Sequence, residues 1–449
     1  MKYVVNMLFT ACLLVGIVGR FMGGWINTQS NDDHVEVVLR ILQNQDVSKD
    51  SCWECFQPKM YYRTHAFMAN FLGNDSRVGV NRQMQLGNVF FSFLGIWWCF
   101  LFLKQRSLSR SKLKLLMGFI LVLPVLFGMS IQNTNDLVIF TLSSGAILFL
   151  DRYSVSHSLL SAFMVLLIIG LAYMVKGSGL AVFLMIGTLL VAQSIKIRSW
   201  LPIAGFSLLI GHLIFFSHYR SNANQYGDPF VTNIGKTFPP SFFNDSLDFY
   251  ARPGIVSVFD SYGKFQFMDL IEHPYNVNSE EYTPHRTSFW AQLYGSFLDT
   301  MFLQHPYYWQ NRNEVRLTIS RAIFILGLWP LSLFILGFLS TLRTGIAKPM
   351  SLVSDVRVWG MLLVAGILIF DMRYAYTYRD YGCIKAHFIV PMLIPIILLV
   401  LEGWKVVQKT RWHNLVRFGL LVFLPLLIYN SAYLIHQLIR ISNGSLTFP

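Results

Sequence analysis

The sequence has 449 residues, of which 54% are hydrophobic and only 13% are charged, with 38 Phe and 11 Trp. Soluble domains carry about twice this charged fraction, so the composition excludes a set of soluble domains and indicates a polytopic membrane protein. The formal net charge of +13 does not indicate a nucleic-acid partner, because Lys and Arg of such a chain collect in short cytoplasmic loops.

Apolar runs that could cross a bilayer, for which about 20 residues are needed, recur along the chain. The first run resembles a signal peptide, but no small-residue cleavage site follows it, so we expect a retained anchor. About eleven transmembrane helices are predicted, near residues 3–23, 86–103, 115–131, 137–150, 158–175, 180–195, 201–217, 317–340, 356–371, 387–403 and 414–436.

The loops between these runs predict an orientation. The loop from Lys104 to Lys114 carries five basic residues, and later turns with Lys or Arg fall on the same side. We therefore expect a cytoplasmic N-terminus. The chain then divides into an N-terminal transmembrane module with a first outer loop at 24–85, an outer loop-rich cap with short helices, and C-terminal transmembrane helices; these three parts are residues 1–217, 218–316 and 317–449.

Acidic residues stand where the first apolar run ends. Asp32 and Asp33 precede His34, and apolar residues then recur at positions 35, 38, 39 and 42, which predicts an amphipathic helix at the membrane surface. One interpretation is structural, because acidic residues favour the N-terminus of a helix. The other is functional, because a carboxylate at this boundary can meet both a soluble acceptor and a lipid head group.

A cysteine-containing motif follows in the same outer loop. Cys52-Trp53-Glu54-Cys55 leads directly into Phe56-Gln57-Pro58-Lys59-Met60-Tyr61-Tyr62. A lone pair of cysteines three residues apart lacks the second pair that a structural zinc site needs. Since the pair is predicted to lie outside the cytoplasm, it could form a disulfide.

These motifs resemble the GT-C superfamily of polyprenyl-phosphate-dependent glycosyltransferases, in particular its protein mannosyltransferase and aminoarabinose transferase branch. Such enzymes carry an acidic pair after the first transmembrane helix, as Asp32 and Asp33 do here. They then carry a Pro-Pro-Leu-Tyr-Tyr type motif, to which Gln57-Pro58-Lys59-Met60-Tyr61-Tyr62 is similar, although Lys59 replaces the second Pro. The resemblance implies a GT-C-like helical bundle with extracytoplasmic loops.

Three later motifs support the resemblance. Asn135-Asp136-Leu137 is similar to the superfamily's Asn-Asp element, and Lys176-Gly177-Ser178-Gly179-Leu180 is similar to its Lys-x-Thr-Gly-Leu hairpin. Ile384-Lys385-Ala386-His387-Phe388, followed by Pro391, is similar to an Ile-Lys-x-Arg-Tyr-x-x-Pro segment. All three are predicted on the outer side.

The resemblance also implies roles for individual residues. Asp32, or else Asp33, is the expected catalytic base. The lipid phosphate is expected at one or more of five cations, although anchoring at helix ends also explains such residues: Lys59, Lys176, Arg373, Arg379 and Lys385. Contacts to the substrate are expected from His34, Glu54, Gln57, Tyr61, Tyr62, Asp136 and Trp290. Trp290 could instead belong to an interfacial aromatic belt.

The sequence thus predicts an inverting glycosyltransferase that uses a polyprenyl-phosphate-linked sugar and a glycan, lipid or protein acceptor. The expected location is the bacterial cytoplasmic membrane with a periplasmic active site, with the endoplasmic reticulum membrane as the alternative. A transporter or flippase of a lipid-linked sugar ranks second, since its functional charges would lie at mid-membrane. A non-catalytic role in envelope assembly is a third hypothesis. Asp32, Asp33 and His34 could hold a divalent metal, but relatives transfer sugars without one.

Overall fold

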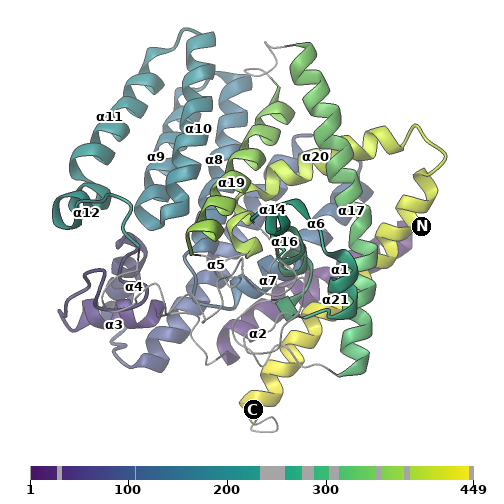
Figure 1. Ribbon diagram of the computed structural model, residues 1–449, viewed down its shortest axis with the longest axis horizontal. Helices are drawn as coiled ribbons and strands as arrows, with labels where there is room; N and C mark the ends of the chain where they lie inside the picture. The colour runs from purple at the N-terminus through teal and green to yellow at the C-terminus, as the bar shows by residue number, and fades with distance from the viewer. Residues whose placement is uncertain are drawn as a thin grey trace.

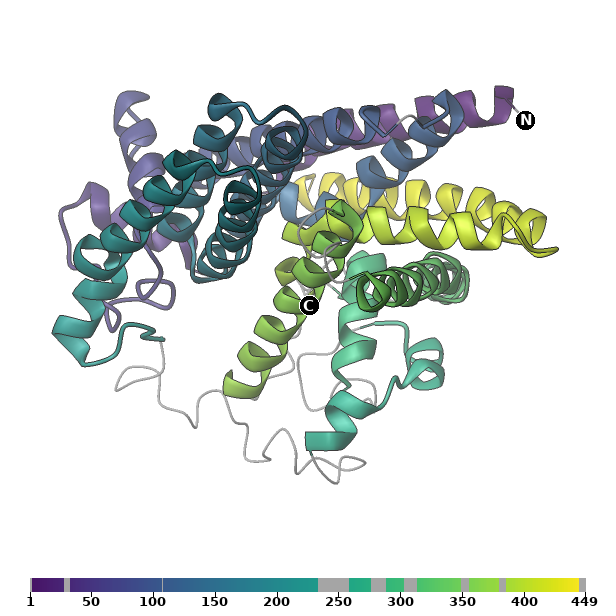
Figure 2. The same ribbon diagram turned by 90° about the horizontal axis from the view of Figure 1, so that it is seen from above.

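The fold is described from a computed structural model. The structure describes residues 2–27, 33–106, 108–232, 258–275, 288–302, 313–348, 355–378 and 385–443. Within these ranges every regular element is a helix and no strand occurs. Figures 1 and 2 show a bundle of long helices that cross at different angles, with shorter helices in more than one part of it.

Most of the long helices are apolar enough to cross a membrane. Within the described ranges nine helical segments meet the requirements of length and composition. They comprise α1 (Lys2–Leu13) with η1 (Leu14–Val18) and α2 (Gly19–Ile26), α5 (Arg77–Lys104), α8 (Asp136–Ser156), α10 (Gly177–Lys196), α11 (Trp200–Phe216) with α12 (His218–Tyr226), α17 (Glu314–Ala347), α19 (Val356–Tyr378), η7 (Val390–Met392) with α20 (Leu393–Val407), and α21 (His413–Ser442).

Two further segments are less regular. The helices α6 (Arg110–Val122) and α7 (Pro124–Ser130) together could make a tenth span, bent by 51° at its centre. The helix α9 (Leu159–Val175) is apolar but has only 17 residues. The prediction of an all-α polytopic membrane protein is therefore confirmed, whereas the predicted number of about eleven spans is not.

The predicted amphipathic helix of the first outer segment is present as α3 (His34–Leu42). Val35 and Val38 share one face of α3 and are fully buried, and Val37 is buried as well. The loop after α3 is closed by a disulfide between Cys52 and Cys55, and α4 (Met60–Phe71) follows it. In Figure 1, α3 and α4 lie together beside α12 at one end of the bundle.

The helices α8, α9 and α10 form an antiparallel group. The turn before α8 and the turn between α9 and α10 both lie at this end of the bundle. Lys176 alone joins α9 to α10, and its backbone is extended with φ of −157°. The two helices approach so closely here that a Cβ on Gly179 would lie 2.0 Å from the carbonyl oxygen of Ala172. Only glycine fits there, so the turn holds Lys176 in one position relative to α9.

A buried cation connects two irregular places in the first helices. Residues 14–18 are π-helical and Pro124 breaks α6 from α7, and both features leave backbone carbonyls without helical partners. Nη1 of Arg20 donates to the carbonyl oxygens of Gly16 at 2.7 Å and Leu121 at 2.5 Å. Its Nε donates to Oγ of Ser92 at 3.2 Å. Arg20 therefore fastens α2 to α5 and α6.

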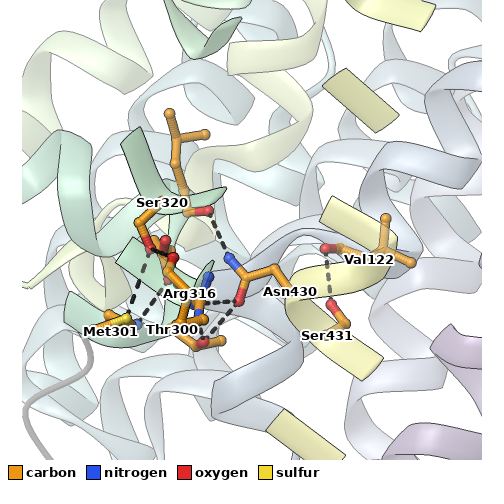
Figure 3. Close-up of polar contacts among 9 residues, drawn as sticks. Val122, Thr300, Met301, Arg316, Ser320, Asn430 and Ser431 are labelled. Carbon is orange, nitrogen blue, oxygen red and sulfur yellow. Dashed lines mark hydrogen bonds and ion pairs between the residues drawn. The ribbon is translucent and has the colours of Figure 1, made fainter. Parts of the chain in front are cut away.

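The remaining short helices are α14 (Val258–Gly263), α15 (Phe267–Glu272), α16 (Phe289–Leu298), η3 (Thr300–Phe302) and η6 (Ala386–Phe388). Figure 3 shows how a buried polar cluster fastens η3 to α17 and α21. Arg316 pairs with Asp299 and donates from Nη2 to Oδ1 of Asn430 at 3.0 Å. Thr300 also donates to Oδ1 of Asn430, at 2.7 Å. This cluster fixes α16 and η3 against the bundle.

Candidate functional site

The candidate site begins at the start of α3. Asp33 occupies the N-cap position, its side chain is half-buried, and its carbonyl oxygen accepts from the Val37 amide at 3.2 Å. His34 is 3% exposed, and its Nδ1 lies 2.8 Å from the hydroxyl oxygen of Tyr62. The two rings stack with centroids 5.8 Å apart. Tyr62 therefore fixes the start of α3 against α4.

Tyr61, next to Tyr62 on α4, connects α4 to α5, and a path of contacts thus leads from His34 into the bundle. Its hydroxyl lies 3.4 Å from Oδ1 of Asn88, and Nδ2 of Asn88 donates to the carbonyl oxygens of Gln132 at 2.6 Å and Thr134 at 3.0 Å. Burial, together with the nearby Asp136 carboxylate, raises the pKa of the Tyr61 phenol. The phenol consequently keeps its proton and remains a hydrogen-bond donor at neutral pH.

The path ends at an ion pair between α8 and the turn before α10. Oδ2 of Asp136 lies 2.7 Å from Nζ of Lys176 and accepts from Oγ1 of Thr134 at 3.0 Å. Both charged side chains are buried. Among the described residues, Oδ1 of Asp136 has no hydrogen-bond partner. A buried pair of this kind is costly to assemble, so its presence at one end of a bundle indicates a functional site.

An irregular strap, residues 385–392, closes the site from the opposite side. The amide of Ala386 donates to Oγ of Ser296 at 2.9 Å, and Oγ of Ser143 donates to the carbonyl oxygen of Pro391 at 2.6 Å. The strap places the Phe388 ring 5.3 Å from Nζ of Lys176. His387 in the same strap acts electrostatically on Asp136. The start of α8, the turn at Lys176 and the strap thus meet at the Asp136–Lys176 pair.

An apolar cavity of about 610 Å³ lies in the adjoining part of the bundle. Its walls come from α6, α16, α17, α19, α20 and α21, and nearly all of its lining is aliphatic or aromatic. Ile389 of the strap lines the cavity two residues after His387. Leu368 of α19 lines it three residues before Asp371. The cavity is therefore suited to a long apolar chain whose polar end reaches the strap.

Three predicted site residues lie instead in the disulfide loop. Glu54 and Gln57 are buried there, and Nζ of Lys59 donates to the carbonyl oxygen of Cys55. Burial lowers the pKa of Lys59 to about 8, an effect that the Glu54 carboxylate opposes. His218 of α12 contacts the same loop, with Nε2 3.0 Å from the carbonyl oxygen of Phe56. Lys59 thus has a structural role in this loop.

The remaining predicted residues are spread over several places. Asp32 and Arg379 lie outside the described residues. Arg373 is exposed on α19, and Lys385 stands half-buried at the start of the strap. Trp290 lines the apolar cavity and donates from Nε1 to the carbonyl oxygen of Tyr262 at 2.6 Å. Of the predicted residues, the structure joins His34, Tyr61 and Tyr62 to one another and Asp136 to Lys176, and Asn88 and Thr134 connect the two groups.

Sequence reasoning missed three residues of the site. Asn88 belongs to a polar stripe with Asn81 and Gln85, at i, i+4 and i+7 of an apolar helix, and this spacing is visible in the sequence. His387 appeared only within the strap motif and was given no role. Asp371 is an isolated acidic residue within an apolar run, a signal that by itself indicates function in a membrane helix.

The described residues contain no group of three or more His, Cys, Asp or Glu side chains that could hold a metal ion. Asp32, which the predicted metal set included, lies outside these residues. No protein-family model matches the sequence, and no curated protein is significantly similar to it.

Proposed function

We propose that this protein is an inverting glycosyltransferase that moves a sugar from a polyprenyl-phosphate donor to an acceptor outside the cytoplasm. The observation that supports this most is the path of contacts from His34 to the Asp136–Lys176 pair, together with the strap, which contacts Lys176 through Phe388 and lines an apolar cavity through Ile389. A lipid-linked donor needs a polar site for its head group next to an apolar site for its chain.

In the proposed reaction the acceptor hydroxyl attacks the anomeric carbon of the sugar from the face opposite the phosphate. Asp32 or Asp33 takes the hydroxyl proton as the new bond forms. The bond between the anomeric carbon and the phosphate oxygen breaks, and its electron pair leaves with the polyprenyl phosphate. The configuration at the anomeric carbon is inverted. Tyr62 supports this step by holding His34, and with it the start of α3, in place.

The leaving phosphate gains negative charge and needs a fixed cation in a site shielded from water. Of the five predicted cations, Lys176 has the strongest support, because it is buried, is held by Asp136 and lies against Phe388, the residue before Ile389 of the cavity wall. Lys59 is occupied by the disulfide loop and Arg373 is exposed. The proposed location is the bacterial cytoplasmic membrane with the site facing the periplasm, or the endoplasmic reticulum membrane.

The proposal is tested with purified protein in lipid nanodiscs, polyprenyl-phosphate sugars and mixed acceptors. We expect acceptor-dependent release of polyprenyl phosphate by the wild type and by Asp75→Asn, which changes an exposed carboxylate in the same outer segment. Asp32→Asn should lose this release by at least a hundredfold while unfolding at a temperature near that of the wild type, and Lys176→Met should lose the release together with stability. Full activity of Asp32→Asn would refute its role as the base.

The same purified protein, reconstituted in sealed vesicles, separates transfer from transport. If sealed vesicles that contain the protein move intact lipid-linked sugar between leaflets and release no polyprenyl phosphate, the protein is a transporter and the proposal is wrong. Asp136 starts α8, Lys176 follows the last residue of α9, and Lys385 precedes η6. This placement favours transfer at a membrane boundary over passage through the membrane centre.

A further inference from the structure

One acidic residue near the site has no role in the mechanism above. Asp371 lies on α19 and is 0% exposed, and neither of its carboxyl oxygens has a hydrogen-bond partner among the described residues. A carboxylate in such a place would be a buried and unpaired charge, which is among the most costly arrangements in a protein. A carboxylic acid, which carries no charge, avoids that cost and has an O–H group to donate.

The surroundings of Asp371 also oppose a negative charge. Burial disfavours a charge on Asp371 most, and among the described residues the Asp136 carboxylate adds repulsion against a second carboxylate. Lys176 is already committed to Asp136 at 2.7 Å. Asp371 is therefore held as an acid beside an ion pair. Enzymes use such a carboxylic acid, kept neutral by an apolar site, as a hydrogen-bond donor to an anion.

Its place on α19 connects Asp371 with the apolar cavity. Val364 and Leu368 line the cavity, and Asp371 follows them at i+7 and i+3, on the same face of the helix. In the strap, Ile389 lines the cavity two residues after His387. A chain bound in the cavity with its polar end toward Leu368 and Ile389 would bring that end near Asp371 and His387.

From this geometry we infer that Asp371 is a neutral acid that donates a hydrogen bond to the phosphate of the lipid-linked donor. The inference rests on the proposed function and assigns the ligand of this one side chain. Lys176 supplies the charge that the phosphate needs, and Asp371 supplies a directed donor without adding to the net charge of the site. No covalent bond forms or breaks at Asp371, and its proton stays on the carboxyl group.

Two substitutions distinguish a neutral donor from a carboxylate. Asp371→Asn keeps the size of the side chain and an N–H donor, whereas Asp371→Leu keeps only the approximate size. We expect Asp371→Asn to bind a polyprenyl phosphate about as tightly as the wild type. Asp371→Leu should bind it about 10- to 100-fold more weakly, the range for one hydrogen bond to a charged group. Both variants should fold, because neither buries a new charge.

Infrared difference spectroscopy gives a readout that is independent of activity. The wild type should show the carbonyl band of a protonated carboxyl group, which is absent from both variants and shifts when a polyprenyl phosphate is added. Polyprenol lacks the phosphate and inorganic phosphate lacks the chain, so neither should shift the band. An equal shift with inorganic phosphate would overturn the assignment to a lipid.

The outcomes separate this inference from the proposed function. If the wild type binds polyprenyl phosphate no better than polyprenol, the proposed function is wrong and the inference is wrong with it. If polyprenyl phosphate binds but no protonated band belongs to residue 371, or the band does not move, the inference alone is wrong. Equal binding by Asp371→Leu and the wild type would also overturn it.

Discussion

Removal of the Lys176 ammonium group should destabilise the protein strongly. In Lys176→Met, the Asp136 carboxylate loses a partner at 2.7 Å and keeps only the Thr134 hydroxyl at 3.0 Å. The side chains of Lys176 and Asp136 are 11% and 8% exposed, so water cannot replace the lost partner. Loss of one member of a buried pair costs about 3–5 kcal/mol. We expect a decrease of this size in the free energy of unfolding.

The chain contains a matched control. Lys405 pairs with Glu402 at a nearly equal distance of 2.8 Å, but its side chain is 63% exposed, and Glu402 also has Arg357 as a partner at 3.0 Å. Exposed pairs contribute less than about 1 kcal/mol, so Lys405→Met should change the free energy of unfolding little. The double variant Lys176→Met with Asp136→Leu removes both charges and should recover most of the lost stability, because it leaves no unpaired carboxylate.

The assay is denaturant unfolding in mild detergent, followed by tryptophan fluorescence, which requires no knowledge of the substrate. The reasoning depends on a difference between two ion pairs of the same length. If Lys176→Met and Lys405→Met lose equal stability, or if the double variant is no more stable than Lys176→Met, then burial of the carboxylate is not the cause and the argument is refuted.

Three further predictions concern other parts of the site. Burial, with a smaller contribution from His34, lowers the pKa of His65 to about 4. Between about pH 4 and 6.5 the unfolded chain therefore binds more protons than the folded protein. The free energy of unfolding should decrease as the pH decreases through this window. His65→Gln should remove that dependence in unfolding measured against pH. For Lys59, with a pKa of about 8, stability should rise as the pH increases from about 8 to 10.5, and Lys59→Met should abolish the rise. Ser296→Ala leaves the Ala386 amide without its acceptor and should cost about 1–3 kcal/mol; an unchanged melting temperature would show that the strap is held by other contacts.

Local patterns in the sequence predicted part of this structure correctly. The spacing of Val35, Val38 and the apolar residues after them predicted α3, because a helix places i, i+3 and i+4 on one face. The sequence left the bonding of Cys52 and Cys55 undecided, and the structure joins them in a disulfide. The break of α6 at Pro124 was not foreseen, because the continuous apolar run around it resembles one straight helix.

The assembly of the site could be predicted only in outline. Asp136 and Lys176 are 40 residues apart, and only the packing of α8, α9 and α10 brings them to 2.7 Å. The contacts of the strap with Ser143 and Ser296 span 248 and 90 residues, and no local pattern encodes them. Trp290 was expected among the residues that contact substrate, and the structure places it in the cavity wall, a position that no local pattern in the sequence indicates. Local periodicity predicts which face of a helix is buried, but it does not predict which other helix packs against that face.

The turn at Lys176 also limits how this protein can be altered. Gly179 allows the backbone of α10 to touch that of α9, so the ammonium group is located by a main-chain contact as much as by its acidic partner. One extra residue in the turn would lengthen the chain by about 3.5 Å, more than a hydrogen bond tolerates. Any redesign that exchanges the cation for another can therefore succeed only if the length of this loop and its small residue are left untouched.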